Sequence, residues 1–367
     1  MAERRYYDER QHRNKRRRRR RRKRRTSLLA TALTLFLLLV LLIGGSLFYL
    51  SNRVLSHIER VDRSEEVWVS PEEARQELAG MIDQENEGTE EGETSAKEDT
   101  LVPEDVVWTA PAEQIKEPTV KNILLIGQDR RPGETRARSD TMILCSINEE
   151  TREISLISFM RDMFVPFPGD YHASRMNHAF AWGGMSMLDQ LIEDDFGVSI
   201  DGNMVVDFES FVQVMNMIAP LEIELKDYEV GYMNRHTQAG FSIGPNLMNG
   251  EQLLVYARMR HVGKADWERT ERQRTVLVKA FEKVRKMSLK EITDLAEEAL
   301  PCFSTDMSNT DILSLVYTVV SKRIVVGGTY RLPVEGTYSA EVVYGMDVLV
   351  PDLRANSDFL RQNLYKH

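Results

Sequence analysis

Two patterns of apolar positions divide the chain. An uncharged apolar run of 24 residues covers 27–50, and beyond Val120 apolar residues recur in short blocks with strand or helix spacing. A helix rises about 1.5 Å per residue, so the first run would extend roughly 36 Å, enough to cross a hydrocarbon core of about 30 Å. We therefore predict one transmembrane helix over 27–50, ahead of a folded domain over 120–367.

The short blocks predict the elements of that domain. Apolar and β-branched runs predict buried strands at 122–127, 141–148, 154–159, 221–225, 329–333 and 342–349. Helical spacing predicts helices at 185–196, 208–218, 250–261 and 270–287, with a polar link at 262–269 between the last two. Strands and helices interleaved in this way predict an α/β domain with a mixed central β-sheet and helices on both faces, in which 329–333 and 342–349 close the sheet.

A polar segment, 51–119, separates the two patterns and is expected to be an acidic stalk. Pro71 follows Ser70, a plausible helix cap, which predicts a helical turn there. Between Asp83 and Asp105, ten acidic residues face one Lys. Such a composition predicts a disordered spacer that repels itself and holds the domain away from the bilayer.

Positive charge is concentrated ahead of the apolar run. Twelve of the thirteen residues from Arg13 to Arg25 are Arg or Lys, although the whole chain has a net charge of −9. Such a block holds the adjoining end of a span inside the cell, so 1–26 is a predicted cytoplasmic tail and the domain is predicted to be extracytoplasmic. A cleaved signal peptide would need a shorter apolar core and a small-residue cleavage site. An Arg-rich arm can also bind nucleic acid. The position beside a span favours attraction to membrane lipid, and we expect no nucleic acid partner.

The chain contains two cysteines, Cys145 and Cys302. Two cysteines do not make a disulfide framework, even in an extracytoplasmic chain. Cys145 lies in a predicted strand and is expected to be a buried small hydrophobe. Whether the two residues are bridged stays open.

Carboxylates and arginines gather between the first two predicted strands. Asp129, Arg138 and Asp140 lie in that single connection, and the sequence offers no nucleophilic triad, zinc-ligand spacing or glycine-rich phosphate loop. Two carboxylates returned to one sheet edge could share a divalent cation, Mg²⁺ or Mn²⁺, while the arginines bind phosphate oxygens. A solvated surface loop is the alternative on spacing alone.

More basic residues follow later elements. Arg161 and Asp162 come directly after the strand at 154–159, and Arg175 precedes a helix. The densest group comprises Arg258, Arg260, Asp266, Arg269, Arg272, Gln273 and Arg274. On a helix, Arg269, Arg272 and Gln273 share one face, which suits a pyrophosphate. An exposed face with salt bridges is the ordinary alternative.

The order of these motifs resembles that of the LytR-CpsA-Psr family of membrane-anchored cell-wall ligases. The resemblance rests on NILLIGQDRR, RSDTMILCSIN, SFMRDMFV, RMNHAFAWGG, LMNGEQLLVYARMRH and DWERTERQR, and it extends from about Asn122 to Tyr365. It implies a phosphotransferase that moves a glycopolymer, teichoic-acid-like or capsular, from a polyprenyl-pyrophosphate carrier to peptidoglycan. The new bond would be a phosphodiester, and polyprenyl phosphate would be released.

The resemblance also implies roles for individual residues. Asp129 and Asp140 would hold Mg²⁺, and the pyrophosphate would be bound by Arg138, Arg161, Arg258, Arg260, Arg269 and Gln273. Arg175 would also bind the substrate; it stands where a Lys is commoner in the family, with the charge retained. Either Asp140 or Asp162 could be the general base, beside Arg161.

The apolar carrier tail would need shelter, for which the helices at 180–187 and 208–217 are candidates, with core packing as the alternative. Two other functions stay open. One is a non-catalytic wall-binding scaffold. The other is a transcriptional attenuator, which would need a cytoplasmic nucleic-acid domain, whereas only 26 residues are predicted inside.

Overall fold

The computed structural model describes residues 54–87, 101–102, 105–128, 130, 136–260, 263 and 266–365. The chain divides into two units, Met1–Leu55 and Ser56–His367, and the fold described below is that of the second. The predicted cytoplasmic tail and the predicted transmembrane helix at 27–50 lie outside the described residues. Among the residues that are described, no helix is both long enough and apolar enough to cross a membrane.

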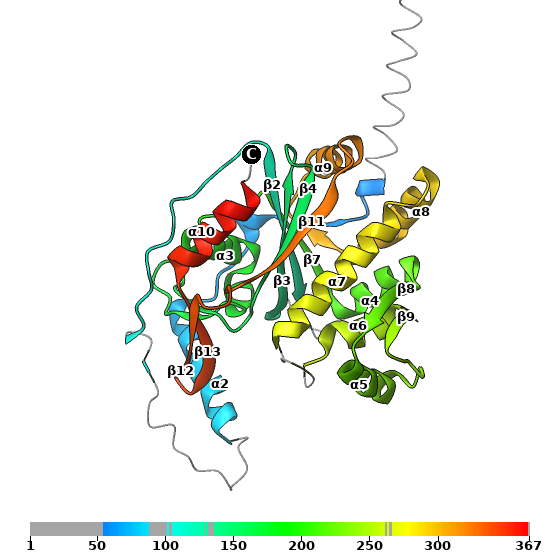
Figure 1. Ribbon diagram of the computed structural model, residues 1–367. Coiled ribbons are helices and arrows are strands. Elements are labelled where there is room, and N and C mark those ends of the chain that lie inside the picture. The colour runs from blue at the N-terminus through cyan, green and yellow to red at the C-terminus, as the bar shows by residue number, and fades with distance from the viewer. Residues whose placement is uncertain are drawn as a thin grey trace, which may run out of the picture. The chain divides into compact units, whose positions relative to one another are not determined.

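A seven-stranded mixed sheet forms the centre of this unit (Figure 1). In spatial order its strands are β1 (Glu59–Arg60), β10 (Ser304–Thr305), β7 (Gly202–Asp207), β2 (Val120–Gln128), β3 (Ser139–Asn148), β4 (Glu153–Phe159) and β11 (Val325–Leu332). β3 is antiparallel to both β2 and β4, whereas β2 is parallel to β7 and β4 is parallel to β11. The prediction of a mixed central sheet is confirmed.

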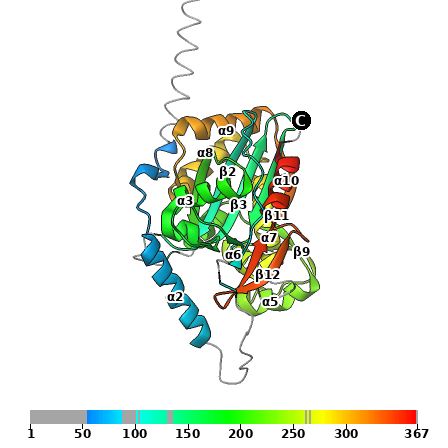
Figure 2. The same ribbon diagram turned by 90° about the vertical axis from the view of Figure 1, so that its left-hand side faces the viewer.

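Helices cover both faces of the sheet (Figures 1 and 2). On one face, α3 (His178–Phe196) and α10 (Leu353–Leu364) share the largest apolar core with side chains such as Leu124, Leu144 and Ile157. On the other face, α7 (Asp266–Val284) and α9 (Asn309–Ser321) pack against β3 and β4 through Leu277 and Leu315. The strands are apolar on both sides because both sides are covered.

A second apolar core lies beyond α7. It joins α4 (Phe208–Ile218), α5 (Asp227–Thr237) and α6 (Gly250–Arg258), flanked by α8 (Leu289–Ala299), to the hairpin of β8 (Leu221–Leu225) and β9 (Gly244–Met248). The predicted strand at 221–225 is present, but it pairs only within this hairpin. α7 begins at Asp266, inside the predicted polar link, because Asp266 and Glu268 in its first turn favour a helix N-terminus.

The prediction that 342–349 closes the central sheet is wrong. β12 (Tyr338–Val343) and β13 (Met346–Pro351) form a separate antiparallel hairpin, and β11 is the edge strand. Another short pair, β5 (Phe164–Val165) and β6 (Ser174–Arg175), lies beside it, since Met163 bridges Leu349. The pattern of apolar residues identifies these strands but carries no information on their partners.

Residues assigned to the stalk contribute to the same compact unit. β1 adds an edge strand to the sheet, and the Glu66 carboxylate accepts backbone N–H groups of Met185 and Ser186, each at 2.9 Å. α2 (Pro71–Glu87) begins at the predicted cap, where Ser70 and Glu73 bond each other's backbone N–H groups, and it continues into the segment expected to be disordered. The compact unit therefore begins at Ser56 and not at Val120, because this segment makes specific polar and strand contacts.

The two cysteines are not bridged. Both Cys145 and Cys302 are free thiols. Cys145 packs with the apolar residues under α7 and α9, and burial raises the pKa of its thiol to about 12. It is the small hydrophobe that its position in the strand predicts.

Candidate active site

Asp140 and Arg161 meet at one edge of the sheet. The β3–β4 register pairs Met142 with Phe159, and the same register carried two residues further brings Asp140 opposite Arg161. Arg161 Nη1 donates a hydrogen bond to Asp140 Oδ1 at 3.0 Å. This contact follows from the antiparallel pairing of two strands that the sequence identifies.

The N-terminal turn of α7 and the residues after α6 complete a charged cluster of five side chains. Arg260 lies 3.4 Å from Asp140 Oδ1 through Nη2. The Asp266 carboxylate lies 3.4 Å from Arg161, 3.7 Å from Arg260 and 3.5 Å from Arg269. Three arginines therefore share two carboxylates, which leaves the cluster with excess positive charge.

The pKa values of the two carboxyl groups beside Arg161, those of Asp140 and Asp162, are shifted in opposite directions. Burial alone would raise the pKa of Asp140, but the charges of Arg161, Arg260 and Arg269 hold it below its ordinary value. Burial, and then the charge of Asp266, raise the pKa of Asp162 above its ordinary value. Asp140 is therefore a stable anion, whereas Asp162 is the stronger proton acceptor.

Arg269 has a buried guanidinium whose hydrogen-bond donors are not all satisfied by the described residues. Its side chain is only 3% exposed, and burial lowers its pKa to about 10. Within the described part of the chain, its Nε and Nη1 have no hydrogen-bond partner. Buried donors that lack a partner carry an energetic cost, so they mark a place where an anion would be stabilised.

Arg272, expected on the same helical face, serves a different purpose. It donates to Glu229 at 2.7 Å, to the Met259 carbonyl at 2.9 Å and to Glu268 at 2.9 Å. These contacts tie α7 to α5 and α6. Its neighbour Arg274 is likewise turned into the fold, donating to Ser158 of β4 at 2.7 Å.

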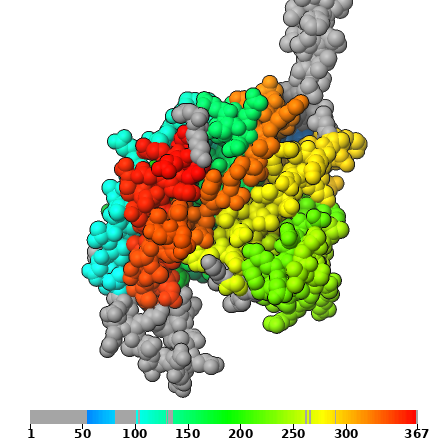
Figure 3. Space-filling model, viewed as in Figure 1, coloured from blue at the N-terminus to red at the C-terminus, as the bar shows by residue number. Residues whose placement is uncertain are grey.

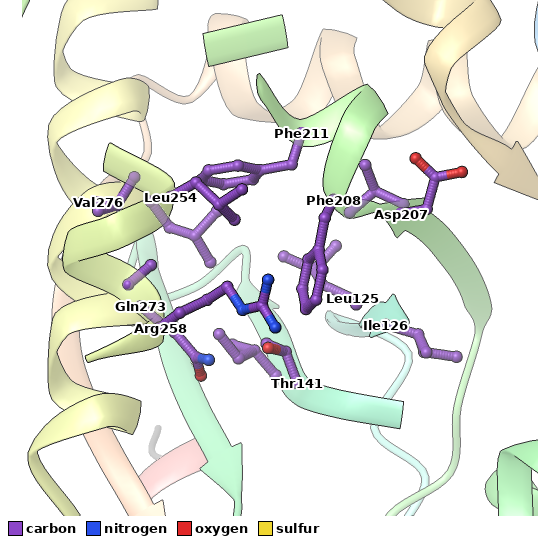
Figure 4. Close-up of a pocket in the computed structure, with 15 residues that line it drawn as sticks. Leu125, Ile126, Thr141, Asp207, Phe208, Phe211, Leu254, Arg258, Gln273 and Val276 are labelled. Atoms are coloured by element: carbon purple, nitrogen blue, oxygen red, sulfur yellow. The ribbon is translucent and has the colours of Figure 1, made fainter. Parts of the chain in front are cut away.

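An apolar pocket adjoins the charged cluster, between the sheet and three helices (Figure 4). It encloses about 620 Å³ including its open mouth, and it is lined by residues of β2, β3, β7, α4, α6 and α7 such as Leu125, Ile143, Val206, Phe211, Leu254 and Val276. Arg258, Gln273 and Thr141 also line it, and the Arg258 guanidinium stacks 4.1 Å from the centre of the Phe208 ring. The pocket and the cluster adjoin because Thr141 follows Asp140 and Arg258 precedes Arg260 by two positions.

Of the two helical segments offered as candidates for an apolar groove, one lines this pocket and the other is packed in the core. Phe208 and Phe211 line the pocket as expected. Phe180 and Met187 are instead buried in the largest core, because α3 covers the opposite face of the sheet. The helical spacing of both segments is similar, and only the topology assigns them to different faces.

Arg138 and Arg175 both lie near His178, at the start of α3. Burial, and then the charges of Arg138 and Arg175, lower the pKa of His178 to about 3. Arg175 also donates to the Asp347 carbonyl at 3.0 Å. The segment joins the same sheet edge, since the Asn177 N–H donates to the Arg161 carbonyl at 3.3 Å. These two arginines thus form a second basic pair at that edge.

A metal site is only partly described. Asp129, the first predicted ligand, lies outside the described residues, and those that are described contain no group of three or more His, Cys, Asp or Glu placed to hold an ion. Asp140 fits a ligand role because it is ionised and has hard oxygen donors. Mg²⁺ is commonly held by one or two carboxylates together with phosphate oxygens, so this donor set is compatible with it.

Asp266 is the residue whose role sequence reasoning missed. Asp266 belongs to the densest group of charged residues, at 258–274, and its spacing there suggests no function. Its carboxylate nevertheless lies within 4 Å of three arginines. The sequence feature that could have indicated this role is an acidic residue at the start of an arginine-rich helix. An acidic residue there is also ordinary helix capping chemistry, which hides its second role.

The folded unit thus combines a mixed α/β sheet, an arginine–aspartate cluster at one sheet edge and a nearby apolar pocket. Residues 80–358 match the family model LytR_cpsA_psr. The chain belongs to the LytR_cpsA_psr family, as the sequence motifs indicate.

Curated relatives carry two kinds of name. The chain is 31% identical over 196 residues to polyisoprenyl-teichoic acid–peptidoglycan teichoic acid transferase TagU of Enterococcus faecalis, covering 52% of this chain and 61% of that protein. It is 29% identical over 237 residues to biofilm regulatory protein A of Streptococcus mutans, covering 59% and 57% respectively. The chain thus spans about three fifths of the length of these relatives.

Solved structures share the fold. TagT bound to LI-WTA matches with a TM-score of 0.55 at 21% identity, covering 70% of this chain and 97% of that one. Bacillus subtilis TagV matches with a TM-score of 0.54 at 22% identity, covering 69% and 100%. TagT with bound octaprenyl pyrophosphate matches with a TM-score of 0.52 at 20% identity, covering 70% and 97%.

Proposed function

We propose that this protein transfers a glycopolymer from a polyprenyl-pyrophosphate carrier to peptidoglycan and releases polyprenyl phosphate. The observation that carries the proposal is a cationic cluster close to an apolar pocket, with buried Arg269 donors that make no hydrogen bond to the described residues. One amphiphile with a pyrophosphate head and a prenyl tail satisfies both parts. The polymer would be teichoic-acid-like or capsular.

The relatives support the same reaction. TagU is named for transferring teichoic acid from a polyisoprenyl carrier to peptidoglycan, and a TagT structure holds octaprenyl pyrophosphate. Other relatives, such as MsrR of Staphylococcus aureus, are named as regulatory proteins. A non-catalytic wall-binding scaffold would bind the carrier without turnover, and a transcriptional attenuator would do neither, so assays of carrier binding and of transfer together separate the three.

The proposed step is a displacement at phosphorus. A sugar hydroxyl oxygen of the acceptor attacks the phosphorus that bears the glycopolymer, and the bond from this phosphorus to the bridging oxygen breaks. Polyprenyl phosphate leaves, and the hydroxyl proton passes to Asp162, whose pKa is raised. Arg161, Arg260 and Arg269 stabilise the charge that spreads over the phosphate oxygens.

Asp140, together with Asp129, would hold a Mg²⁺ or Mn²⁺ ion. When bound, such an ion supplies positive charge to the pyrophosphate oxygens. Asp140 also orients Arg161, from which it accepts a hydrogen bond, and Arg260, with which it forms an ion pair, and this fixes the donors before the substrate arrives.

Membrane anchoring through 27–50, with the folded unit outside, belongs to the same proposal. It rests on the apolar run and the basic block that precedes it. Protease treatment of intact protoplasts should digest the folded unit and spare the basic tail. A protected folded unit would contradict this topology.

The reaction is tested with the full chain in nanodiscs, a polyprenyl-pyrophosphate donor and peptidoglycan fragments. Arg260→Ala should slow transfer by roughly 30- to 1,000-fold, because a charge-assisted contact to the transition state contributes about 2–4 kcal/mol. Arg354→Ala is the matched control, since the exposed Arg354 side chain forms its ion pair with Asp358, one turn further along α10 and away from the charged cluster. Equal rates for the two variants would contradict the proposal.

A further inference from the structure

Among the described residues, the outward side of α9 carries three exposed apolar side chains in its C-terminal half, beside the exposed polar residues Thr310, Asp311, Ser314 and Ser321. Leu315 and Val319 pack inward against the core under β3 and β4. Val316, Tyr317 and Val320 point outward and are 52%, 74% and 67% exposed. A helix on a protein surface ordinarily carries polar residues on its outer side, so apolar residues on both sides indicate a partner. Figure 3 shows α9 in orange on the surface of the molecule.

This face is linked closely to the start of the folded unit. Arg60 of β1 donates to the Met307 carbonyl and to Asn309 Oδ1, at the N-terminus of α9. Only the five residues 51–55 separate the apolar run ending at Leu50 from Ser56. An extended chain covers at most about 3.6 Å per residue, so a bilayer that holds 27–50 lies within roughly 22 Å of Ser56.

Positively charged residues lie at the C-terminal end of this apolar face. Lys322 and Arg323 follow α9 directly and are exposed. Arg152 is also exposed, and its carbonyl accepts the N–H of Val325, the residue that begins β11. Apolar and tyrosine side chains flanked by Lys and Arg suit the boundary between acyl chains and phosphate headgroups.

The position of α9 in the fold fits that boundary. β11, which follows α9, starts opposite Glu153 at the beginning of β4, whereas Arg161 follows the end of β4. α9 thus reaches the end of the sheet opposite to the charged cluster (Figure 1). A bilayer against α9 would leave that cluster directed toward the wall.

We propose that Val316, Tyr317 and Val320 contact the lipid bilayer interface and set the orientation of the folded unit on the membrane. This inference rests on the membrane anchor included in the proposed function, but it does not depend on the transfer reaction. A second copy of the chain is the alternative occupant, which the experiment distinguishes.

The test is photo-crosslinking with the full chain in vesicles of phosphatidylglycerol and phosphatidylethanolamine. The photoreactive residue p-benzoylphenylalanine replaces Tyr317 in one variant and Leu247 in the control. Leu247 is a matched position because it is apolar, 63% exposed and located on the distant β8–β9 hairpin. Melting temperatures equal to that of the wild type show that both variants are folded.

We expect lipid adducts at position 317 and several-fold fewer at position 247, as measured by mass spectrometry. Adducts between two chains at position 317 would assign the face to a dimer and overturn the proposal. Equal lipid labelling at both positions, or none at 317, would also overturn it. Transfer activity is not measured, so failure here leaves the proposed reaction standing, and failure of the reaction leaves this result standing.

Discussion

Arg269 and Arg272 allow a direct comparison of a substrate-binding arginine with a structural one. They lie three residues apart on α7, and each has a side chain no more than 3% exposed. Arg272 has its donors satisfied by Glu229, Glu268 and the Met259 carbonyl. Arg269 has two donor nitrogens without a hydrogen-bond partner among the described residues. The same substitution should therefore have opposite effects at the two positions.

Arg272→Met should lower stability, because it leaves the carboxylate of Glu229, 1% exposed, without its partner. Breaking such a pair costs about 3–5 kcal/mol. Arg269→Met should leave the melting temperature unchanged or raise it, since a buried donor without a partner itself costs about 1–3 kcal/mol. Asp266 keeps Arg161 and Arg260 in that variant.

The activities should follow a different order. Arg269→Met should reduce transfer from the polyprenyl-pyrophosphate donor by roughly 30- to 1,000-fold, equivalent to about 2–4 kcal/mol of transition-state stabilisation. The assay pairs thermal melts with initial rates at saturating donor. The reasoning would be refuted if Arg269→Met melted several degrees below the wild type, or if it retained at least a third of the wild-type rate at an unchanged melting temperature.

Three further predictions concern carboxyl groups. Asp140→Ala should abolish the stimulation of transfer by Mg²⁺ with little change in the melting temperature, and retained stimulation in a Mg²⁺ titration would exclude Asp140 as a ligand. Asp162→Asn should remove the acidic limb of the kcat/KM profile against pH, because burial raises the pKa of this carboxyl in the wild type. A profile that keeps the limb would assign the base elsewhere. Burial, then Asp194, raise the pKa of Asp195 to about 8. Between about pH 4 and pH 8 the folded state thus keeps a proton on Asp195 that the unfolded state has released. The free energy of unfolding therefore falls as the pH rises through this range, by at most about 1.4 kcal/mol per pH unit. Asp195→Asn should flatten the decrease in free energy of unfolding between pH 5 and pH 8, and an unchanged slope would contradict this.

The apolar pattern of two consecutive strands is enough to predict which side chains meet at the sheet edge of the site. The strands containing Asp140 and preceding Arg161 are apolar, adjacent in sequence and antiparallel, so their register alone brings these two side chains together. The arginines of α7 are harder to assign. Spacing places Arg269 and Arg272 on one side of the helix, but only the packing of α5 supplies Glu229 and turns Arg272 into a structural contact.

Long-range pairing accounts for the other differences. The apolar runs at 221–225 and 342–349 predict strands, but the hairpin pairing of β8 with β9 and of β12 with β13 keeps both out of the central sheet. The stalk was expected to stand apart because it is polar, yet Glu66 is bound by backbone N–H groups in α3, more than a hundred residues away. Contacts of this kind leave no periodic signal in the sequence.

The most direct test of the proposed reaction is the identity of the lipid product. The full chain is incubated with a glycopolymer on polyprenyl pyrophosphate, with peptidoglycan and Mg²⁺, and the products are analysed by mass spectrometry. The account predicts polyprenyl monophosphate in equal amount to polymer joined to peptidoglycan through one phosphate, with both products formed roughly 30- to 1,000-fold more slowly by Arg269→Met. Release of polyprenyl pyrophosphate, or binding of the donor with no transfer by the wild type, would contradict it.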